Sequence, residues 1–227
     1  MKKLLLFIFL LSSQLNYGQE DYILAENYYR DGSYEKATQI FKKLYTKSPF
    51  NTTYLKRLID CYQETSQYKM VDSILKTQLK TNPNLTYLNV ELGYNYEKQQ
   101  QKEVAKEYYD KAINSIEKNP GLGGYIGRLF KENNLLASAL LAYEKAMQLN
   151  PNANYNIQIA QIYGEQGEFE KMFQTYIDLV DKDENYINAI KRFTSKYITD
   201  NRLNKNNILF KKIVLKKSVS NPKNSWN

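Results

Sequence analysis

Residues 92–112 read LGYNYEKQQQKEVAKEYYDKA, and this stretch decides the fold. Leu92 stands four residues before Tyr96, and Ala105 stands four residues before Tyr109. Side chains three or four residues apart share one face of an α-helix. The stretch therefore predicts two amphipathic helices in succession, joined by a short break.

The same arrangement recurs along the whole chain at a nearly constant interval. The aromatic position of the first helix returns as Tyr28, Tyr62, Tyr96, Phe130, Tyr163 and Tyr197. Four residues before each of these stands a large apolar residue, namely Leu24, Leu58, Leu92, Ile126, Ile159 and Phe193. The second helix repeats a large residue at Phe41, Leu75, Tyr109, Tyr143, Tyr176 and Phe210. Interlocking series with one shared period predict stacked, self-similar units.

Glycine and proline mark the boundaries of these units. Gly32 and Gly167 lie in polar breaks between two helices, where the positive φ that glycine adopts easily ends a helix tightly. Prolines follow asparagine or serine between units, at Pro49, Pro83, Pro120 and Pro151. Proline disfavours helix at the preceding residue and suits the start of the next helix. Each unit is thus predicted to be one helix-turn-helix pair.

The combined pattern resembles the tetratricopeptide repeat (TPR) family. In that family the first helix carries Leu, then Gly or Ala, then an aromatic residue, as in Leu92-Gly93 with Tyr96. Small residues let adjacent helices approach, and the aromatic ring fills the gap beside them. The resemblance covers about Glu20 to Pro222. It implies an all-α, right-handed superhelical solenoid of about six TPR-like helix-turn-helix repeats, and it is specific for the fold but not for function.

The array is expected to occupy residues 19–200, with about five clear repeats and the first helix of a sixth. Residues 201–227 are expected to hold the basic second helix of the sixth repeat and the start of an incomplete seventh, because Asn221-Pro222 and Trp226 repeat the start of a unit. A solenoid normally ends in a polar capping helix, and the sequence pattern predicts no such helix after the sixth repeat. We therefore expect either that the chain is a fragment of a longer array or that a partner contacts its uncapped C-terminal end.

Residues 1–18 have the layout of a secretory signal peptide. Lys2 and Lys3 precede the apolar run LLLFIFLL at residues 4–11, and a polar stretch follows to Gly18. Eight helical residues span about 12 Å, far less than the roughly 30 Å core of a bilayer. We therefore predict export to the periplasm or cell surface of a bacterium, with no transmembrane anchor after signal cleavage.

The composition argues against catalysis and against metal or cofactor binding. The chain has no histidine, and its one cysteine, Cys61, lies in a helical pattern and is expected to be a small core residue. Histidine-assisted nucleophiles and imidazole metal sites are thereby excluded. The glycine cluster at residues 121–127 lacks the preceding strand that a phosphate-binding loop needs. We predict a protein that is not an enzyme, with no catalytic residue, metal or cofactor.

The resemblance also implies a partner-binding groove lined by the first helices. Tyrosines and charged residues fall on that side of the helices at Tyr22, Glu26, Tyr29, Arg30, Lys56, Asp60, Tyr87, Tyr94, Lys98, Arg128 and Lys131, with Glu64 and Glu97 at the same spacing. Tyrosine offers a large amphipathic contact at low entropic cost. We predict an exported scaffold that binds a protein or peptide there. The alternative is that these are ordinary surface residues.

The positive charge is concentrated at one end. The chain carries +8, of which residues 201–227 contribute seven and Lys2 with Lys3 contribute two, so residues 4–200 carry −1. Apolar spacing over residues 206–219 predicts a basic amphipathic helix, whose lysines are Lys211, Lys212, Lys216 and Lys217. Binding of a polyanion or a membrane surface by this helix is the alternative function. Nucleic acid is not the expected partner.

Overall fold

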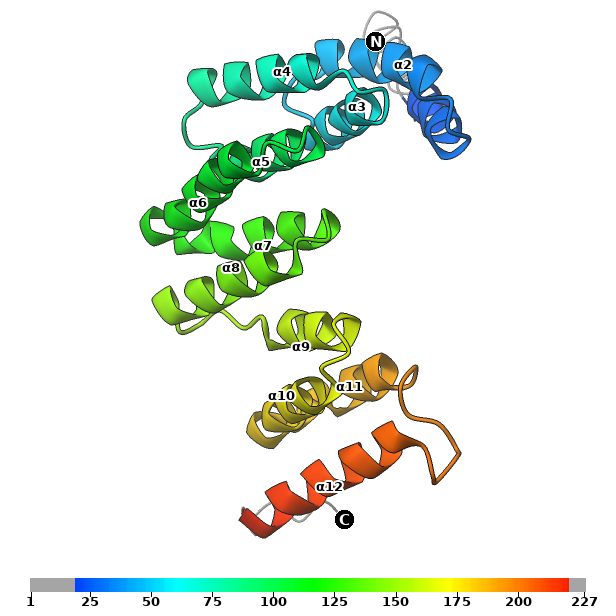
Figure 1. Cartoon of the computed structure of the whole chain (residues 1–227), viewed down its shortest axis with the longest axis vertical. Helices are drawn as coiled ribbons and strands as arrows, with labels where there is room; N and C mark the ends of the chain where they lie inside the picture. Colours follow the sequence, from blue (N-terminus) through cyan, green and yellow to red (C-terminus); the bar gives the residue numbers. More distant parts are fainter. Residues whose placement is uncertain (1–18, 221–227) are drawn as a thin grey trace, which may run out of the picture. The chain divides into compact units, whose positions relative to one another are not determined.

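The computed structural model describes residues 19–220, in which all regular structure is helical and no strand occurs. The predicted signal peptide and the start of a seventh repeat lie outside the described residues. The first helix covers residues 19–30. The helices labelled in Figure 1 are α2 Tyr34–Lys47, α3 Thr52–Glu64, α4 Tyr68–Thr81, α5 Leu88–Lys98, α6 Lys102–Lys118, α7 Gly123–Glu132, α8 Leu136–Leu149, α9 Asn156–Glu165, α10 Phe169–Lys182, α11 Ile187–Thr194 and α12 Lys205–Ser220. Two short 3₁₀ helices, η1 Pro120–Leu122 and η2 Glu184–Tyr186, precede α7 and α11. The α-helices form six consecutive pairs within this part of the chain, which confirms the predicted all-α repeat fold.

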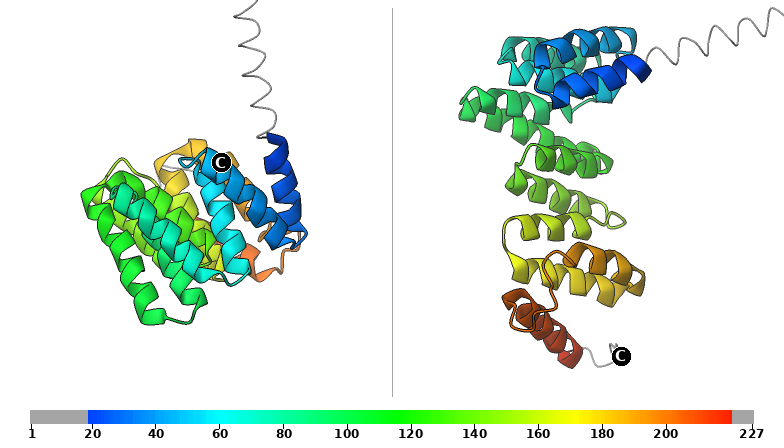
Figure 2. Two further views of the ribbon diagram at one scale, coloured as in Figure 1. Left: turned by 90° about the horizontal axis from the view of Figure 1, so that it is seen from above. Right: turned by 90° about the vertical axis from the view of Figure 1, so that its right-hand side faces the viewer.

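The chain divides into two compact units, residues 1–111 and 112–227, and the boundary falls inside α6. In the first unit α3 packs against α4 of its own pair, while the contacts of α2 with α3 and of α4 with α5 join successive pairs. In the second unit α7 packs against α8 and α9 against α10, in each case within one pair. Figure 2 shows the two helices of a pair lying side by side. The core of the first unit includes Phe41, Leu58 and Leu75, and that of the second includes Phe173 and Tyr176.

The two helices of a pair approach closely where the first helix carries glycine. A Cβ atom added at Gly127 would lie 2.6 Å from a ring carbon of Tyr143 on the paired helix. A Cβ at Gly93 would likewise overlap the ring of Tyr109. These are the small and aromatic positions of the repeat, so the ring occupies the space that a side chain would need.

In the second pair the first helix carries a larger residue and the second helix a smaller one than in the pairs with glycine and tyrosine. Ile59 stands at the position of Gly93 and Gly127, and Leu75 stands at the position of the two tyrosines. Both side chains are completely buried in one core cluster. A larger residue on the first helix is therefore accommodated by a smaller one on the second.

The sixth pair differs from the prediction, which placed Tyr197 in its first helix. α11 ends at Thr194, and residues 195–204 form a turn. The amide of Asn207 holds this turn by donating to the carbonyl oxygens of Thr199 (2.5 Å) and Asn201 (2.9 Å). Tyr197 still packs on α10, where its ring lies 5.3 Å from that of Phe169. The aromatic position of the repeat is thus kept outside the helix.

α3, the first helix of the second pair, begins at a side-chain cap. The Oδ1 atom of Asn51 accepts hydrogen bonds from the backbone N–H groups of Thr53 (3.0 Å) and Tyr54 (3.1 Å). These two N–H groups have no partner within the helix, so the cap fixes the residue at which α3 starts.

We expect Gly127→Ala to lower the free energy of unfolding by about 1–3 kcal/mol, because the new methyl group collides with the ring of Tyr143. In a Tyr143→Leu background the same change should be neutral or stabilise by up to about 1 kcal/mol, since alanine favours helix over glycine. Urea denaturation of the four proteins measures both values. An equal cost in the two backgrounds would contradict this explanation of the repeat.

We expect Asn51→Ala to lower the free energy of unfolding by about 1 kcal/mol, within the range of roughly 0.5–2 for lost caps. Ser33 precedes α2 but makes no side-chain cap bond, so Ser33→Ala is the matched control and should change stability by less than about 0.5 kcal/mol. Denaturant titration of both variants tests this difference. Equal costs for the two variants would show that the cap does not stabilise α3.

Candidate functional site

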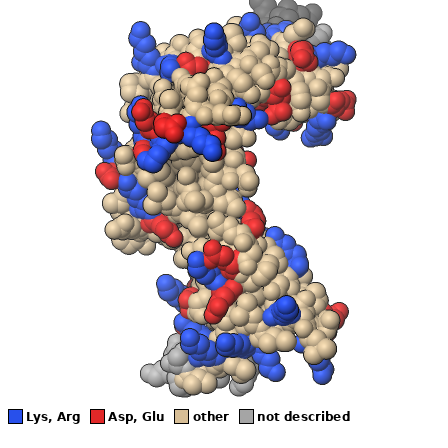
Figure 3. All heavy atoms as spheres, in the orientation of Figure 1, with Lys and Arg blue, Asp and Glu red and all other residues tan. Residues whose placement is uncertain are grey.

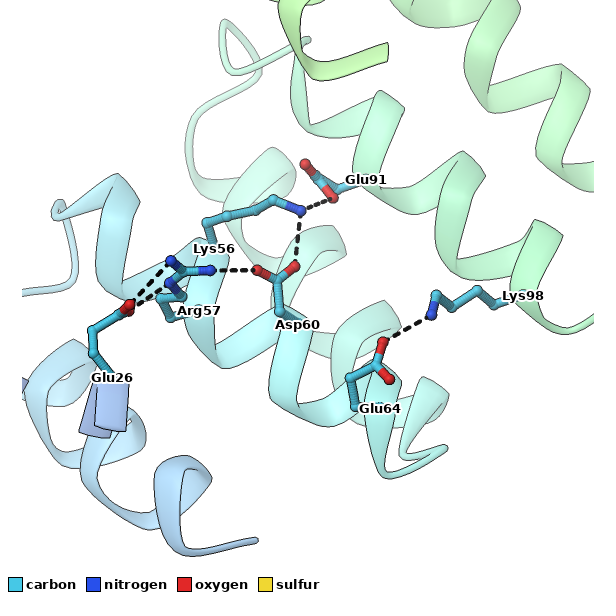
Figure 4. Close-up of polar contacts among 7 residues, drawn as sticks. All are labelled: Glu26, Lys56, Arg57, Asp60, Glu64, Glu91 and Lys98. Atoms are coloured by element: carbon cyan, nitrogen blue, oxygen red, sulfur yellow. Dashed lines mark hydrogen bonds and ion pairs between the residues drawn. The ribbon is translucent and has the colours of Figure 1, made fainter. Parts of the chain in front are cut away.

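Charged side chains from three consecutive first helices meet in the first unit (Figure 4). α3 lies between the helix over residues 19–30 and α5, and it contributes to every ion pair of the group. We call this group the ion-pair network: Glu26, Lys56, Arg57, Asp60, Glu64, Glu91 and Lys98. It contains four carboxylates and three cations, so its formal charge is −1.

Arg57 links α3 to the preceding first helix. Its guanidinium group lies 2.5 Å and 3.1 Å from the two carboxylate oxygens of Glu26, a two-point contact. The other side of the same group lies 3.6 Å from Asp60. Planar two-point pairing of this kind is geometrically specific, so Arg57 fixes the helix over residues 19–30 against α3.

Lys56 and Lys98 link α3 to the following first helix. The Nζ atom of Lys56 lies 2.8 Å from Asp60 and 3.4 Å from Glu91. Lys98 on α5 lies 3.0 Å from Glu64, one turn further along α3. Residues 56, 60 and 64 are one helical turn apart and share one helix face, so α3 contacts α5 at two levels, through Lys56 and Glu64.

Two carboxylates of the network are buried. Glu26 is 7% exposed and Glu91 is 3% exposed. A buried carboxylate is costly unless it is paired and hydrogen-bonded. Each lies against a cation of α3, and removal of that cation would leave a buried charge uncompensated.

The network also sets the protonation of its members. Burial lowers the pKa of Lys56, but the carboxylates of Glu91 and Asp60 outweigh burial and raise that pKa above its usual value. Burial and, to a smaller extent, the carboxylate of Asp60 raise the pKa of Tyr29 to about 12, although Arg57 opposes this rise. Lys56 is therefore charged and Tyr29 neutral at pH 7.

Two of the predicted tyrosines each lie beneath a cation of the network. The guanidinium of Arg57 lies 4.8 Å from the ring centre of Tyr29, and the ammonium of Lys98 lies 5.5 Å from that of Tyr94. Both rings are half-buried. Cation–π contacts of this kind order the charged side chain over the ring. We call the surface formed by these two tyrosines and the network the first-helix face.

The remaining predicted residues lie apart from the network. Tyr22 packs against Phe41 and Tyr54, Arg30 is exposed, and Tyr87 is half-buried at the start of α5. Arg128 and Lys131 belong to the second unit, where they pair with Glu132 (3.3 Å) and Glu165 (3.1 Å).

Sequence reasoning missed Arg57 and Glu91, which are central to the network. Both stand directly before a large apolar residue of the repeated series, and they are themselves one repeat apart with opposite charge. Opposite charges at one repeat position would suggest that Arg57 and Glu91 pair with each other. In the structure they do not, because Arg57 reaches back to Glu26 and Glu91 is paired with Lys56.

Sequence reasoning also missed a cavity in the second unit. It has a volume of about 210 Å³ and is lined by Gln161, Glu165, Tyr176, Phe193, Lys196 and Tyr197. Two of the lining residues belong to the turn that follows α11, so the cavity depends on the early end of that helix. Two of the lining side chains are aromatic rings that stack, those of Tyr176 and Phe193, with centroids 6.3 Å apart.

The predicted basic helix is α12. Phe210 packs edge-on against Phe173 of α10 at 5.2 Å, and Ile213 is buried. Lys211, Lys212 and Lys216 are exposed, whereas Lys217 lies 2.7 Å from Asp178 and 3.2 Å from Asp181 of α10. Figure 3 shows Lys and Arg side chains gathered over this end of the second unit.

Among the described residues, one thiol, the acidic side chains and the lengths of the helices bear on catalysis, metal binding and membrane insertion. Burial raises the pKa of the Cys61 thiol to about 12, so this buried cysteine stays protonated at pH 7 and is not nucleophilic. Between residues 19 and 220 no group of three or more Cys, Asp or Glu side chains is arranged to hold a metal ion. No helix in this range is long and apolar enough to cross a membrane.

Comparison with known proteins gives matches of fold. The family model described as tetratricopeptide repeat matches residues 87–119, and no curated protein matches the chain. Among solved structures the chain is similar to a thermophilic TPR protein of Thermus thermophilus, with 15% identity over 78% of this chain and 97% of that one and a TM-score of 0.42. It is also similar to pilF of Pseudomonas aeruginosa, with 16% identity over 90% and 92% and a TM-score of 0.39.

A third similar structure is YrrB, described as a TPR protein with an unusual peptide-binding site. It is 17% identical over 76% of this chain and 89% of that one, with a TM-score of 0.36. The residues that match the family model cover α5 and α6, one complete helix pair. The other pairs repeat its pattern at the same period. The findings therefore support a tetratricopeptide repeat fold, with a direct match to the family model over residues 87–119.

Proposed function

We propose that this protein is an exported scaffold, without enzymatic activity, that holds a protein or peptide partner on the first-helix face. The TPR fold supports a role in protein–protein interaction. The observation that carries the proposal is the ion-pair network, which links three successive first helices and holds Arg57 and Lys98 over Tyr29 and Tyr94. Charged and aromatic groups are thereby ordered on one surface before a partner arrives.

Ordering in advance matters because immobilising a long side chain on binding costs about 0.5–1.5 kcal/mol. The cations of the network are already held by carboxylates and rings, so most of that cost is met during folding. A partner that meets this face gains tyrosine contacts and hydrogen bonds with little further loss of entropy.

The charge of the face restricts its partner. The cations of the network already have carboxylate partners, and its formal charge is −1. A strongly acidic peptide would have to displace these carboxylates. We therefore propose a partner that is neutral or weakly basic and that presents apolar and main-chain groups to the half-buried tyrosines.

Export remains part of the proposal. It rests on the lysines and the apolar run of residues 2–11. The periplasm or the cell surface of a bacterium is the proposed location, and the chain that begins at Gln19 is the proposed mature form.

The chain beginning at Gln19, immobilised as bait in an extract of its host, should retain a partner that Tyr29→Ala/Tyr94→Ala no longer retains. The loss should be at least tenfold, as expected for two aromatic contact residues. The matched control is Tyr45→Ala/Tyr108→Ala, which removes two half-buried tyrosines from second helices. Thermal melts of both variants exclude unfolding. Equal retention by the two variants would refute binding at the first-helix face.

Exchanging the two charges of the Glu64–Lys98 pair tests whether this pair contacts the partner or only stabilises the fold. Glu64→Lys combined with Lys98→Glu keeps an ion pair between α3 and α5 but reverses the position of each charge. We expect the free energy of unfolding to change by less than about 0.5 kcal/mol, since both side chains are partly exposed. Partner affinity should fall by at least fivefold in equilibrium titration. Unchanged affinity would mean that this pair only supports the fold.

A further inference from the structure

α12 carries apolar side chains on two opposite sides. One side packs on α10 through Phe210 and Ile213. The other side is open, with Ile208 55% exposed, Leu215 54% exposed and Val219 80% exposed. These three are spaced at two turns and then one turn of helix, which places them along one face. Leu203, in the turn just before α12, is 82% exposed as well.

Comparison among the repeats shows that apolar residues at the positions of Ile208 and Leu215 are combined only in α12. At the position of Leu215 the other second helices carry only polar residues, namely Thr46, Lys80, Asn114, Gln148 and Asp181. At the position of Ile208 they carry Gln39, Ser73, Glu107, Leu141 and Gln174, of which four are polar. The fold therefore does not require apolar residues at these positions, and another constraint must explain them.

The same face is strongly basic. Lys205, Lys211, Lys212 and Lys216 are exposed on or beside the apolar row, and the sequence has no Asp or Glu between residues 201 and 220. Lys217, which binds two carboxylates of α10, belongs to the packed side. An occupant of the open face must therefore be anionic and must also bury apolar side chains.

We propose that the outer face of α12 binds the surface of a bilayer that contains anionic lipids. The helix would lie in the plane of the interface, with Ile208, Leu215 and Val219 in the acyl boundary and the lysines at the headgroups. Lysine stems are long enough to lie along apolar surface while the ammonium group reaches the phosphates. A nucleic acid would pair with the lysines but would leave the apolar row in contact with water.

The geometry agrees with a planar ligand. The exposed apolar residues from Ile208 to Val219 extend over about 16 Å along the helix, at about 1.5 Å per residue, so a flat surface can contact all of them. Each lysine close to an anionic surface strengthens binding roughly fivefold. This proposal does not depend on the first-helix face, which belongs to the other compact unit.

Co-sedimentation with vesicles tests the proposal. The chain beginning at Gln19 is used, because the apolar run of residues 4–11 would bind lipid by itself. We expect binding to vesicles of phosphatidylglycerol and phosphatidylethanolamine, weakening as salt is raised, and at least 50-fold weaker binding to phosphatidylcholine. Lys211→Gln/Lys212→Gln/Lys216→Gln should lower the affinity by about 100-fold.

Two further variants distinguish a lipid surface from a general polyanion and from a second copy of the chain as the occupant of this face. Ile208→Ser/Leu215→Ser keeps every charge and should still lower vesicle affinity at least tenfold. Lys42→Gln/Lys47→Gln/Lys80→Gln removes three exposed lysines from other second helices and should leave it unchanged. The proposal is overturned if the apolar variant binds normally, which would indicate a general polyanion site. It is also overturned if sedimentation shows that this variant dissolves a dimer, which would assign the face to a second copy.

Discussion

The close approach of an aromatic ring to a small residue is the contact on which the rest of the structure depends. It sets the distance between the two helices of a pair, as Tyr143 does above Gly127. The second pair reaches the same result with Ile59 and Leu75, so total volume matters more than the identity of either residue. Because this contact holds a first helix against its own second helix, it also helps to determine where the side chains of the first helix lie.

The ion-pair network follows from that placement. Successive first helices lie close enough for Arg57 to reach Glu26 and for Lys56 to reach Glu91. Neither carboxylate could be buried without its cation. The network therefore acts in two ways: it ties three repeats together, and it holds cations over the rings of Tyr29 and Tyr94. A surface that is ordered in this way suits recognition of a partner more than catalysis.

The constant period of the sequence was sufficient to predict the helix pairs and their aromatic positions, because a repeated pattern is visible without knowledge of contacts. It did not predict that Arg57 pairs with Glu26 or that Glu91 pairs with Lys56, since pairing depends on how far each side chain reaches across to its neighbour. It also failed at α11, where hydrogen bonds from Asn207 to the backbone fix a turn that includes Tyr197. The cavity lined by Phe193 and Lys196 depends on that turn, so it could not be predicted either.

Hydrogen–deuterium exchange of the chain with its captured partner would locate the contact surface without any substitution. We expect the partner to slow exchange in residues 56–64 and 88–98, which belong to α3 and α5, and to leave α2 and α4 unchanged. Slower exchange confined to the second helices or to α12 would contradict binding at the first-helix face.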